Sequence, residues 1–106
     1  MSLRSALAGV SGILVTPFDA DDRIAPARLE PIVDRALAAG LHIPVVNGNT
    51  GEFYSLTVDE AEAICAEVCA MVGARAPVLA GVGRSVGDAC RLAAAAARAG
   101  AAGLMV

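Results

Sequence analysis

The sequence has 106 residues with 57% apolar and 18% charged side chains, which suits one globular domain and excludes both two domains and intrinsic disorder. Its net charge of −3, few aromatic residues and lack of a basic run argue against nucleic-acid binding. A membrane-spanning helix needs about 20 apolar residues in a row. No stretch approaches that length, so no membrane segment is expected.

The first part of the chain predicts a strand followed by a helix. An apolar run at residues 12–17 is typical of a buried strand. Apolar residues then recur at the spacing of one helix face, and Gly40 ends that pattern. The apolar face comprises Leu29, Ile32, Val33, Ala36 and Leu37.

Two further strand and helix pairs follow. A second apolar run at residues 43–46 precedes a helix that opens at Thr57, where Glu60 completes a capping-box pattern. A third strand at residues 78–80 precedes a helix over residues 87–99, which Ser85 and Asp88 are expected to cap in the same way. Residues 103–106 predict the opening of a fourth strand.

The spacing of these strands predicts a parallel sheet. Successive strands begin about 25 to 35 residues apart, which is the length of a β–α unit with a right-handed crossover. The strands are continuous apolar runs without alternation, as expected where both sheet faces are covered. The fold class is therefore α/β, with about three and a half β–α units.

Loops that follow the strands are expected to share one face, where parallel α/β proteins bind ligands. Three loops qualify, at residues 16–18, 48–52 and 81–85. In the second, Gly48 and Gly51 are expected to permit unusual backbone conformations that aim amides inward, beside the Thr50 hydroxyl. This predicts a site for a small anion such as a carboxylate. The alternative is a structural glycine-rich turn that Glu52 supports.

Three motifs resemble the first third of the dihydrodipicolinate synthase and N-acetylneuraminate lyase family: Thr16-Pro17-Phe18, Gly48-Asn49-Thr50-Gly51-Glu52 with Ser55-Leu56-Thr57 and Glu60 behind it, and Ala80-Gly81-Val82-Gly83. The resemblance implies that residues 1–106 are the N-terminal segment of one (β/α)8 TIM barrel domain. Because such a barrel needs about 250 residues, the chain is expected to be part of a longer enzyme.

The resemblance also implies an activity. Enzymes of this family form a Schiff base between a lysine and a 2-keto acid, commonly pyruvate. By position, the Thr50 hydroxyl and amide and the Gly51 amide would bind the keto-acid carboxylate, within the loop that begins at Gly48. Asn49 stands where the synthases usually carry a proton-relay threonine, which disfavours synthase chemistry. The Phe53-Tyr54 pair instead resembles the 5-dehydro-4-deoxyglucarate dehydratase branch.

The family's Schiff-base lysine and catalytic tyrosine belong to later strands, beyond Val106. All eight basic residues are arginine, and Tyr54 follows the wrong strand to replace that tyrosine. The resemblance implies no metal and no organic cofactor, and it implies a homo-oligomer, either a tetramer or a dimer. The odd cysteine count at no metal-finger spacing and the lack of a signal sequence favour a cytoplasmic location.

Two other functions remain open from the residues themselves. The chain could be a small non-catalytic α/β module that binds an anion through the same loop. It could also be a dinucleotide-binding half-domain, because the stretch from Gly81 to Gly87 joins a strand to a helix. That reading lacks the acidic residue expected about 20 positions further on. Arg84 in this stretch is either a ligand for a substrate anion or a solvated side chain.

Other reactive residues have plainer interpretations. Cys65 and Cys69 lie one helical turn apart on an apolar stripe, so they are expected in the core rather than on a metal. His42 precedes a strand and is therefore expected at the end of the sheet opposite the site, in a structural role.

The absence of lysine gives a direct prediction. Borohydride reduction of the 106-residue chain with pyruvate should trap no adduct on any internal side chain, because no side-chain primary amine is available to form an imine. Mass spectrometry of the reduced chain, with the N-terminal amine blocked, measures this. A stoichiometric internal adduct would contradict the prediction.

Overall fold

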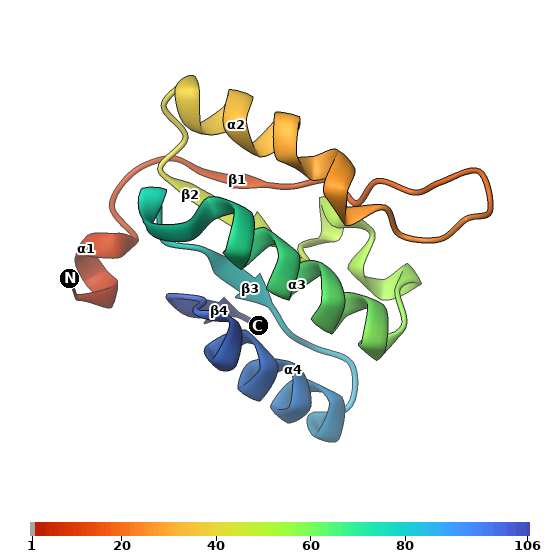
Figure 1. Ribbon diagram of the computed structural model, residues 1–106. Helices are drawn as coiled ribbons and strands as arrows, with labels where there is room; N and C mark the ends of the chain where they lie inside the picture. Colours follow the sequence, from red (N-terminus) through yellow and green to blue (C-terminus); the bar gives the residue numbers. More distant parts are fainter. Residues whose placement is uncertain (1) are drawn as a thin grey trace.

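The computed structural model describes residues 2–106, which form a four-stranded parallel sheet (Figure 1). The strands are β1 (Ser11–Ile13), β2 (Ile43–Val46), β3 (Leu79–Gly81) and β4 (Gly103–Met105), and they lie side by side in chain order. Val45 is the register partner of both Ile13 and Leu79, and Leu79 is also the partner of Gly103. The predicted parallel sheet is confirmed.

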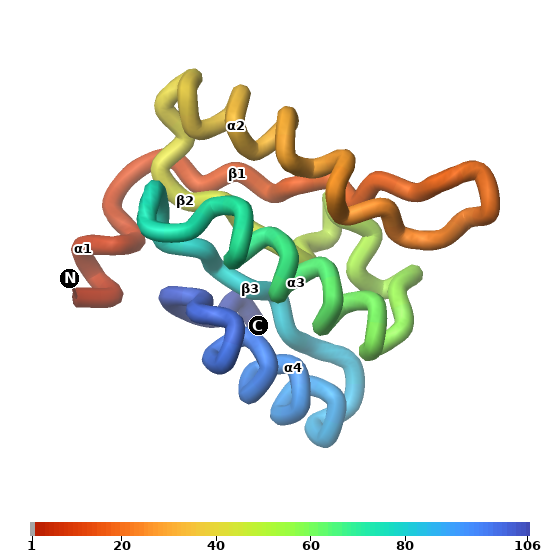
Figure 2. Tube along the Cα trace, viewed as in Figure 1, coloured from red at the N-terminus to blue at the C-terminus, as the bar shows by residue number. Residues whose placement is uncertain are grey.

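The three long helices cover one face of this sheet. Helices α2 (Glu30–Ala38), α3 (Val58–Val72) and α4 (Val86–Ala99) lie together in front of the strands in Figures 1 and 2. Consecutive strand order with helices on one face is the arrangement of a (β/α)8 barrel, whereas doubly wound sheets reverse their strand order and carry helices on both faces. The chain therefore has the fold of the N-terminal portion of a TIM barrel.

Local sequence sets where α3 and α4 begin. The Thr57 hydroxyl accepts from the Glu60 amide at 3.1 Å, and the Glu60 carboxylate accepts from the Thr57 amide at 2.9 Å, which confirms the capping box. The Ser85 hydroxyl likewise accepts from the Asp88 amide at 3.0 Å. Both caps lie at the end of the molecule to which the strands' carboxyl ends point.

The N-terminal region differs from the prediction. The first strand ends at Ile13 rather than at residue 17, because Pro17 has no amide to donate to a ladder and Thr16 turns toward another loop. A one-turn helix, α1 (Leu3–Ala6), precedes β1 and was not predicted, since its four residues are too few to show a periodic pattern. A 3₁₀ turn, η1 (Pro26–Leu29), leads into α2, and η4 (Gly73–Arg75) follows α3.

The core lies between the helices and the sheet. The α3 side chains fill its centre, and β-strand and α2 side chains pack against them. Its fully buried members include Leu29, Val33, Val46, Leu56, Ile64, Val68 and Val72. Cys65 and Cys69 belong to this core, as predicted. The hydrogen bond with the Cys69 side chain and, after it, burial raise the pKa of the Cys65 thiol above its ordinary value, which keeps that sulfur in the neutral, inert form.

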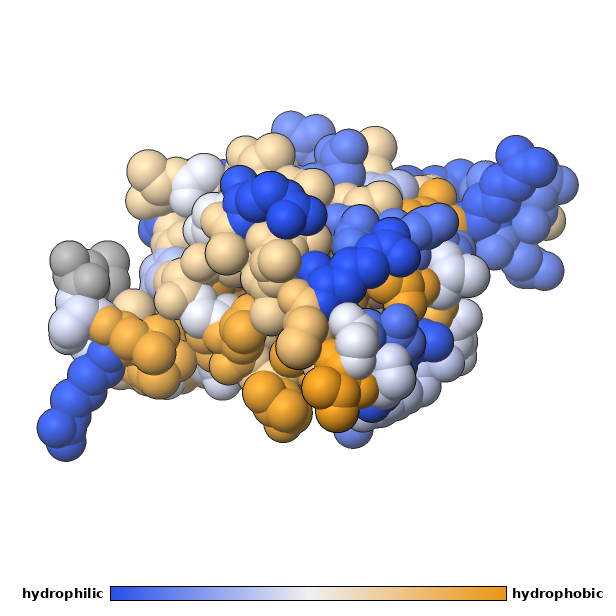
Figure 3. Space-filling view, turned by 90° about the horizontal axis from the view of Figure 1, so that it is seen from below, coloured by the Kyte–Doolittle hydropathy of each residue, from blue (hydrophilic) through white to orange (hydrophobic). Residues whose placement is uncertain are grey.

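The sheet presents apolar side chains on the face away from the helices and at its margins. Within residues 2–106, the outer edges of β1 and β4 pair with no further strand. Exposed apolar residues gather there, namely Ile13, Val15, Leu104, Met105 and Val106. Figure 3 shows apolar atoms over the α4 and β4 side of the molecule. Unpaired strand edges beside exposed apolar surface favour association.

The 106-residue chain expressed alone should therefore be oligomeric or poorly soluble, because association removes this apolar surface and these edges from water. Sedimentation velocity over a range of protein concentrations measures the effect. A compact monomer that melts in one cooperative calorimetric transition would show that the segment needs no partner.

Candidate functional site

The loop between β2 and α3 is built from two consecutive 3₁₀ turns at the carboxyl end of the sheet. The first turn is η2 (Asn49–Gly51) and the second is η3 (Phe53–Ser55). Glu52 joins them in the left-handed conformation, with a φ of 58°. The backbone of the loop therefore turns twice between β2 and α3.

Its two glycines are required by close packing rather than by backbone conformation, which corrects the prediction. Positive φ values occur at Asn47 and Glu52 on either side, and not at Gly48 or Gly51. A Cβ atom on Gly48 would lie 2.6 Å from the Ile13 Cγ2 atom. A Cβ atom on Gly51 would lie 2.8 Å from the backbone oxygen of Leu14. The loop thus presses directly against the end of β1.

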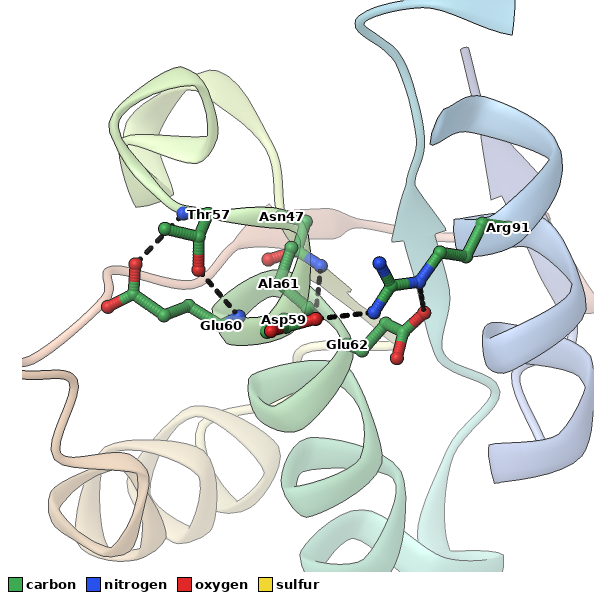
Figure 4. A network of polar contacts seen from close by, with 7 residues as sticks. All are labelled: Asn47, Thr57, Asp59, Glu60, Ala61, Glu62 and Arg91. Carbon is green, nitrogen blue, oxygen red and sulfur yellow. Dashed lines mark hydrogen bonds and ion pairs between the residues drawn. The ribbon is translucent and has the colours of Figure 1, made fainter. Parts of the chain in front are cut away.

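Two buried polar side chains hold this loop in place. The Thr16 hydroxyl donates to the Gly51 carbonyl oxygen at 2.6 Å, which ties the loop to the chain after β1. The Asn47 side-chain amide donates to the Ala61 carbonyl oxygen at 2.9 Å in the first turn of α3, as Figure 4 shows. Asn47 was not among the predicted site residues, although asparagine at a strand end is a known signal of left-handed backbone.

The turn leaves two backbone donors unused. The Gly51 amide donates to the Gly48 carbonyl oxygen at 3.0 Å, and the Glu52 amide donates to the Asn49 carbonyl oxygen at 2.9 Å. The amides of Asn49 and Thr50 donate to no protein acceptor within residues 2–106. The Gly51 amide, expected to bind the carboxylate, is thus already used within the turn, whereas the Thr50 amide is unused.

A pocket of about 330 Å³ lies at the carboxyl ends of the strands beside this loop. Gly48 and Asn49 line it, while Thr50 is exposed at the loop surface and Gly51 is buried beneath. The remaining lining residues are Ile13, Asn47, Phe53, Tyr54, Val82, Met105 and Val106. The structure therefore brings the expected loop to the expected end of the sheet, with Asn49 nearer the pocket than Thr50.

Arg84 is exposed, as one of its two interpretations expected, and it also contacts the neighbouring loop. Its Nη2 atom donates to the Phe53 carbonyl oxygen at 3.0 Å, and its guanidinium lies 5.4 Å from the centroid of the Phe53 ring. In the same segment, a Cβ atom on Gly83 would lie 3.3 Å from the Phe53 ring. Gly83 thus allows close contact with the neighbouring loop, which accounts for a glycine at this position without a nucleotide.

The remaining candidates have structural roles. His42 lies at the amino end of β2, where its Nδ1 atom accepts from the Val10 amide at 3.0 Å, as expected. On the outer surface, Arg91 of α4 bridges the carboxylates of Asp59 and Glu62 on α3 (Figure 4). Within residues 2–106, no cluster of His, Cys, Asp or Glu could hold a metal ion, and no helix is long and apolar enough to cross a membrane.

Comparison with known proteins identifies the class to which this fold and site belong. Residues 6–106 match the model of the dihydrodipicolinate synthetase family. The 4-hydroxy-tetrahydrodipicolinate synthase of Stenotrophomonas maltophilia is 38% identical over 80 residues, covering 76% of this chain and 27% of the relative. The enzyme of that name from Salinibacter ruber is 36% identical over 99 residues, covering 92% and 33%.

Solved structures give the same picture. Dihydrodipicolinate synthase from Bacillus clausii superposes with a TM-score of 0.91 at 38% identity, covering 97% of this chain and 35% of that one. A prophage protein of the dihydrodipicolinic acid synthase family from Escherichia coli K12, solved in complex with pyruvate, gives 0.88 at 29% identity, covering 92% and 33%.

The chain belongs to the dihydrodipicolinate synthetase family, because the family model matches nearly its whole length. It spans about a third of the length of the relatives that it matches. The resemblance seen in the sequence motifs is confirmed.

The contact of Gly51 with β1 leads to a stability prediction. Gly51→Ala should lower the free energy of unfolding by about 1–3 kcal/mol, because the new Cβ meets backbone that must shift. Gly87→Ala is the matched control. Its nearest neighbouring atom is 3.9 Å away, and alanine favours helix over glycine by roughly 0.5–1 kcal/mol. Urea unfolding of both variants at one protein concentration tests this, and equal stability would show that the loop does not need Gly51.

Proposed function

We propose that this chain forms the first part of a Schiff-base-forming lyase, synthase or dehydratase that acts on pyruvate or another 2-keto acid. Its contribution is the loop from Gly48 to Glu52, which binds the keto-acid carboxylate. The observation that carries the proposal is the pair of unused amides at Asn49 and Thr50, in a turn fixed at the carboxyl end of a parallel sheet. Family membership and the pyruvate complex of a structural neighbour support it.

The chemistry of the turn fits an anion. The first amides of a 3₁₀ turn have no acceptor within the turn, so they carry a partial positive charge toward whatever lies in front of them. A carboxylate accepts two such bonds at once, and the Thr50 hydroxyl adds a third donor on the same loop. Charge-assisted bonds of this kind fix the orientation of the keto group that the lysine attacks.

The lysine that forms the imine comes from strands outside these 106 residues, and the imine serves as the electron sink for chemistry at the neighbouring carbon. An asparagine at position 49 cannot pass protons as a hydroxyl does, which favours a dehydratase or lyase over a synthase, as do Phe53 and Tyr54. We expect no metal or organic cofactor, a cytoplasmic location and assembly into dimers or tetramers. Within each subunit, the further β–α units of the barrel cover the exposed inner face of the sheet.

The test uses a chimera in which residues 1–106 replace the corresponding part of the Bacillus clausii synthase, whose backbone superposes closely on this chain. Thr50→Val keeps the side-chain shape but removes the hydroxyl. Losing a hydrogen bond to a charged group costs about 1.5–3 kcal/mol, so the pyruvate concentration at which half of the chimera is trapped as a borohydride-reduced imine should rise about ten- to a hundredfold. Mass spectrometry of the reduced chimera over a range of pyruvate concentrations measures this.

Thr57→Val is the control, because Thr57 caps α3 and lies outside the proposed carboxylate site. It should lower stability by about 1 kcal/mol and leave the pyruvate concentration for half-maximal imine trapping nearly unchanged. If Thr50→Val traps the imine at the same pyruvate concentration as the parent chimera, the loop is not the carboxylate site.

A further inference from the structure

Arg84, in the loop after β3, contacts the loop between β2 and α3. Its backbone is left-handed, with a φ of 73°, a conformation uncommon for residues with a Cβ atom. Such strain persists only where surrounding contacts hold it, and it concentrates at functional sites. The contacts that hold Arg84 are those with Phe53, on the neighbouring loop.

Arg84 contacts Phe53 in two ways, through a half-buried hydrogen bond and through a cation–π interaction. The guanidinium donates to the Phe53 carbonyl oxygen, which also accepts from the Leu56 amide at 3.1 Å and is thereby saturated. The same guanidinium lies over the Phe53 ring within the range of a cation–π interaction. The Phe53 side chain is itself only 3% exposed. The planar guanidinium thus fixes both the backbone and the ring of one residue.

We infer that Arg84 is a positioning residue for the carboxylate-binding loop, a role that rests on the proposed function. The loop is held on one side by Thr16, which hydrogen-bonds Gly51 from the end of β1. Arg84 holds the other side, two residues along at Phe53, from the end of β3. The unused amides of Asn49 and Thr50 precede this clamped stretch directly. Arg84 therefore fixes the direction in which those amides point without touching the substrate.

Hydrogen exchange of the chimera in which residues 1–106 replace the corresponding part of the Bacillus clausii synthase, followed by mass spectrometry, tests the inference without any ligand. The amides of Gly51, Glu52, Ser55 and Leu56 all donate within the two turns. In Arg84→Gln, the peptide covering residues 48–56 should exchange about tenfold faster, as expected for losing one charge-assisted bond. Arg84→Lys, which keeps a charge and a donor, should recover most of the protection.

Two further variants separate this effect from unfolding and from loss of charge. Arg84→Gly relieves the left-handed backbone, so the chain should unfold at the same or a higher urea concentration while the loop still exchanges faster. Arg91→Gln removes the same charge from the outer surface of α4 and should leave residues 48–56 protected as in the otherwise unaltered chimera. If Arg84→Gly and Arg91→Gln give equal protection of this peptide, the positioning role is rejected.

A second measurement with sodium pyruvate as the probe distinguishes this inference from the proposed function. Pyruvate should slow exchange at residues 48–52 in the otherwise unaltered chimera, and Arg84→Gln should raise the pyruvate concentration needed about fivefold to tenfold. If pyruvate leaves exchange at residues 48–52 unchanged without the substitution while Arg84→Gln still speeds exchange there, the proposed carboxylate site is wrong. The positioning of the loop by Arg84 is then still supported. If pyruvate protects both proteins at the same concentrations, Arg84 does not position the site.

Discussion

The contact between the β2–α3 loop and the end of β1 is the constraint on which the site depends. Gly51 packs against the Leu14 carbonyl oxygen, at a distance that leaves no room for a side chain. The Thr16 hydroxyl then reaches the Gly51 carbonyl oxygen at 2.6 Å, so this part of the loop is held through its backbone. A backbone held in this way keeps its amides in fixed directions. Preorganised amides of this kind bind an anion without reorganising at the moment of binding.

The same region shows why the helices behind the loop matter to it. Asn47 leaves the sheet in the left-handed conformation and donates to the Ala61 carbonyl oxygen of α3. The start of α3 is in turn fixed by the capping box of Thr57 and Glu60 (Figure 4). The core side chains of α3 anchor that helix on the sheet. The start of the loop is thus held by the Asn47 hydrogen bond to α3, and α3 is held by its capping box and by its buried side chains.

Local patterns in the sequence predicted most of the architecture. The capping residues of α3 and α4 contact near neighbours in the chain, and the apolar repeat of α2 and the spacing of the strands can be read directly from the sequence, although Ile32 of that repeat is 40% exposed. The order of predicted strands and loops correctly placed the loop at the carboxyl ends of the strands. What the sequence could not reveal depends on distant partners. That Gly51 meets Leu14, and that Arg84 meets Phe53 across 31 residues, follows only from how the strands lie side by side.

The error over the two loop glycines has the same physical origin. Glycine is selected either for positive φ or for close approach, and one sequence cannot distinguish the two reasons. Here the positive φ values fall on Asn47, a residue type that adopts them readily, and on Glu52, while Gly48 and Gly51 serve the approach to β1. This separation of positive φ values from close packing suits an anion site. Because Gly48 and Gly51 are pressed against β1, the backbone that carries the Asn49 and Thr50 amides has little room to move.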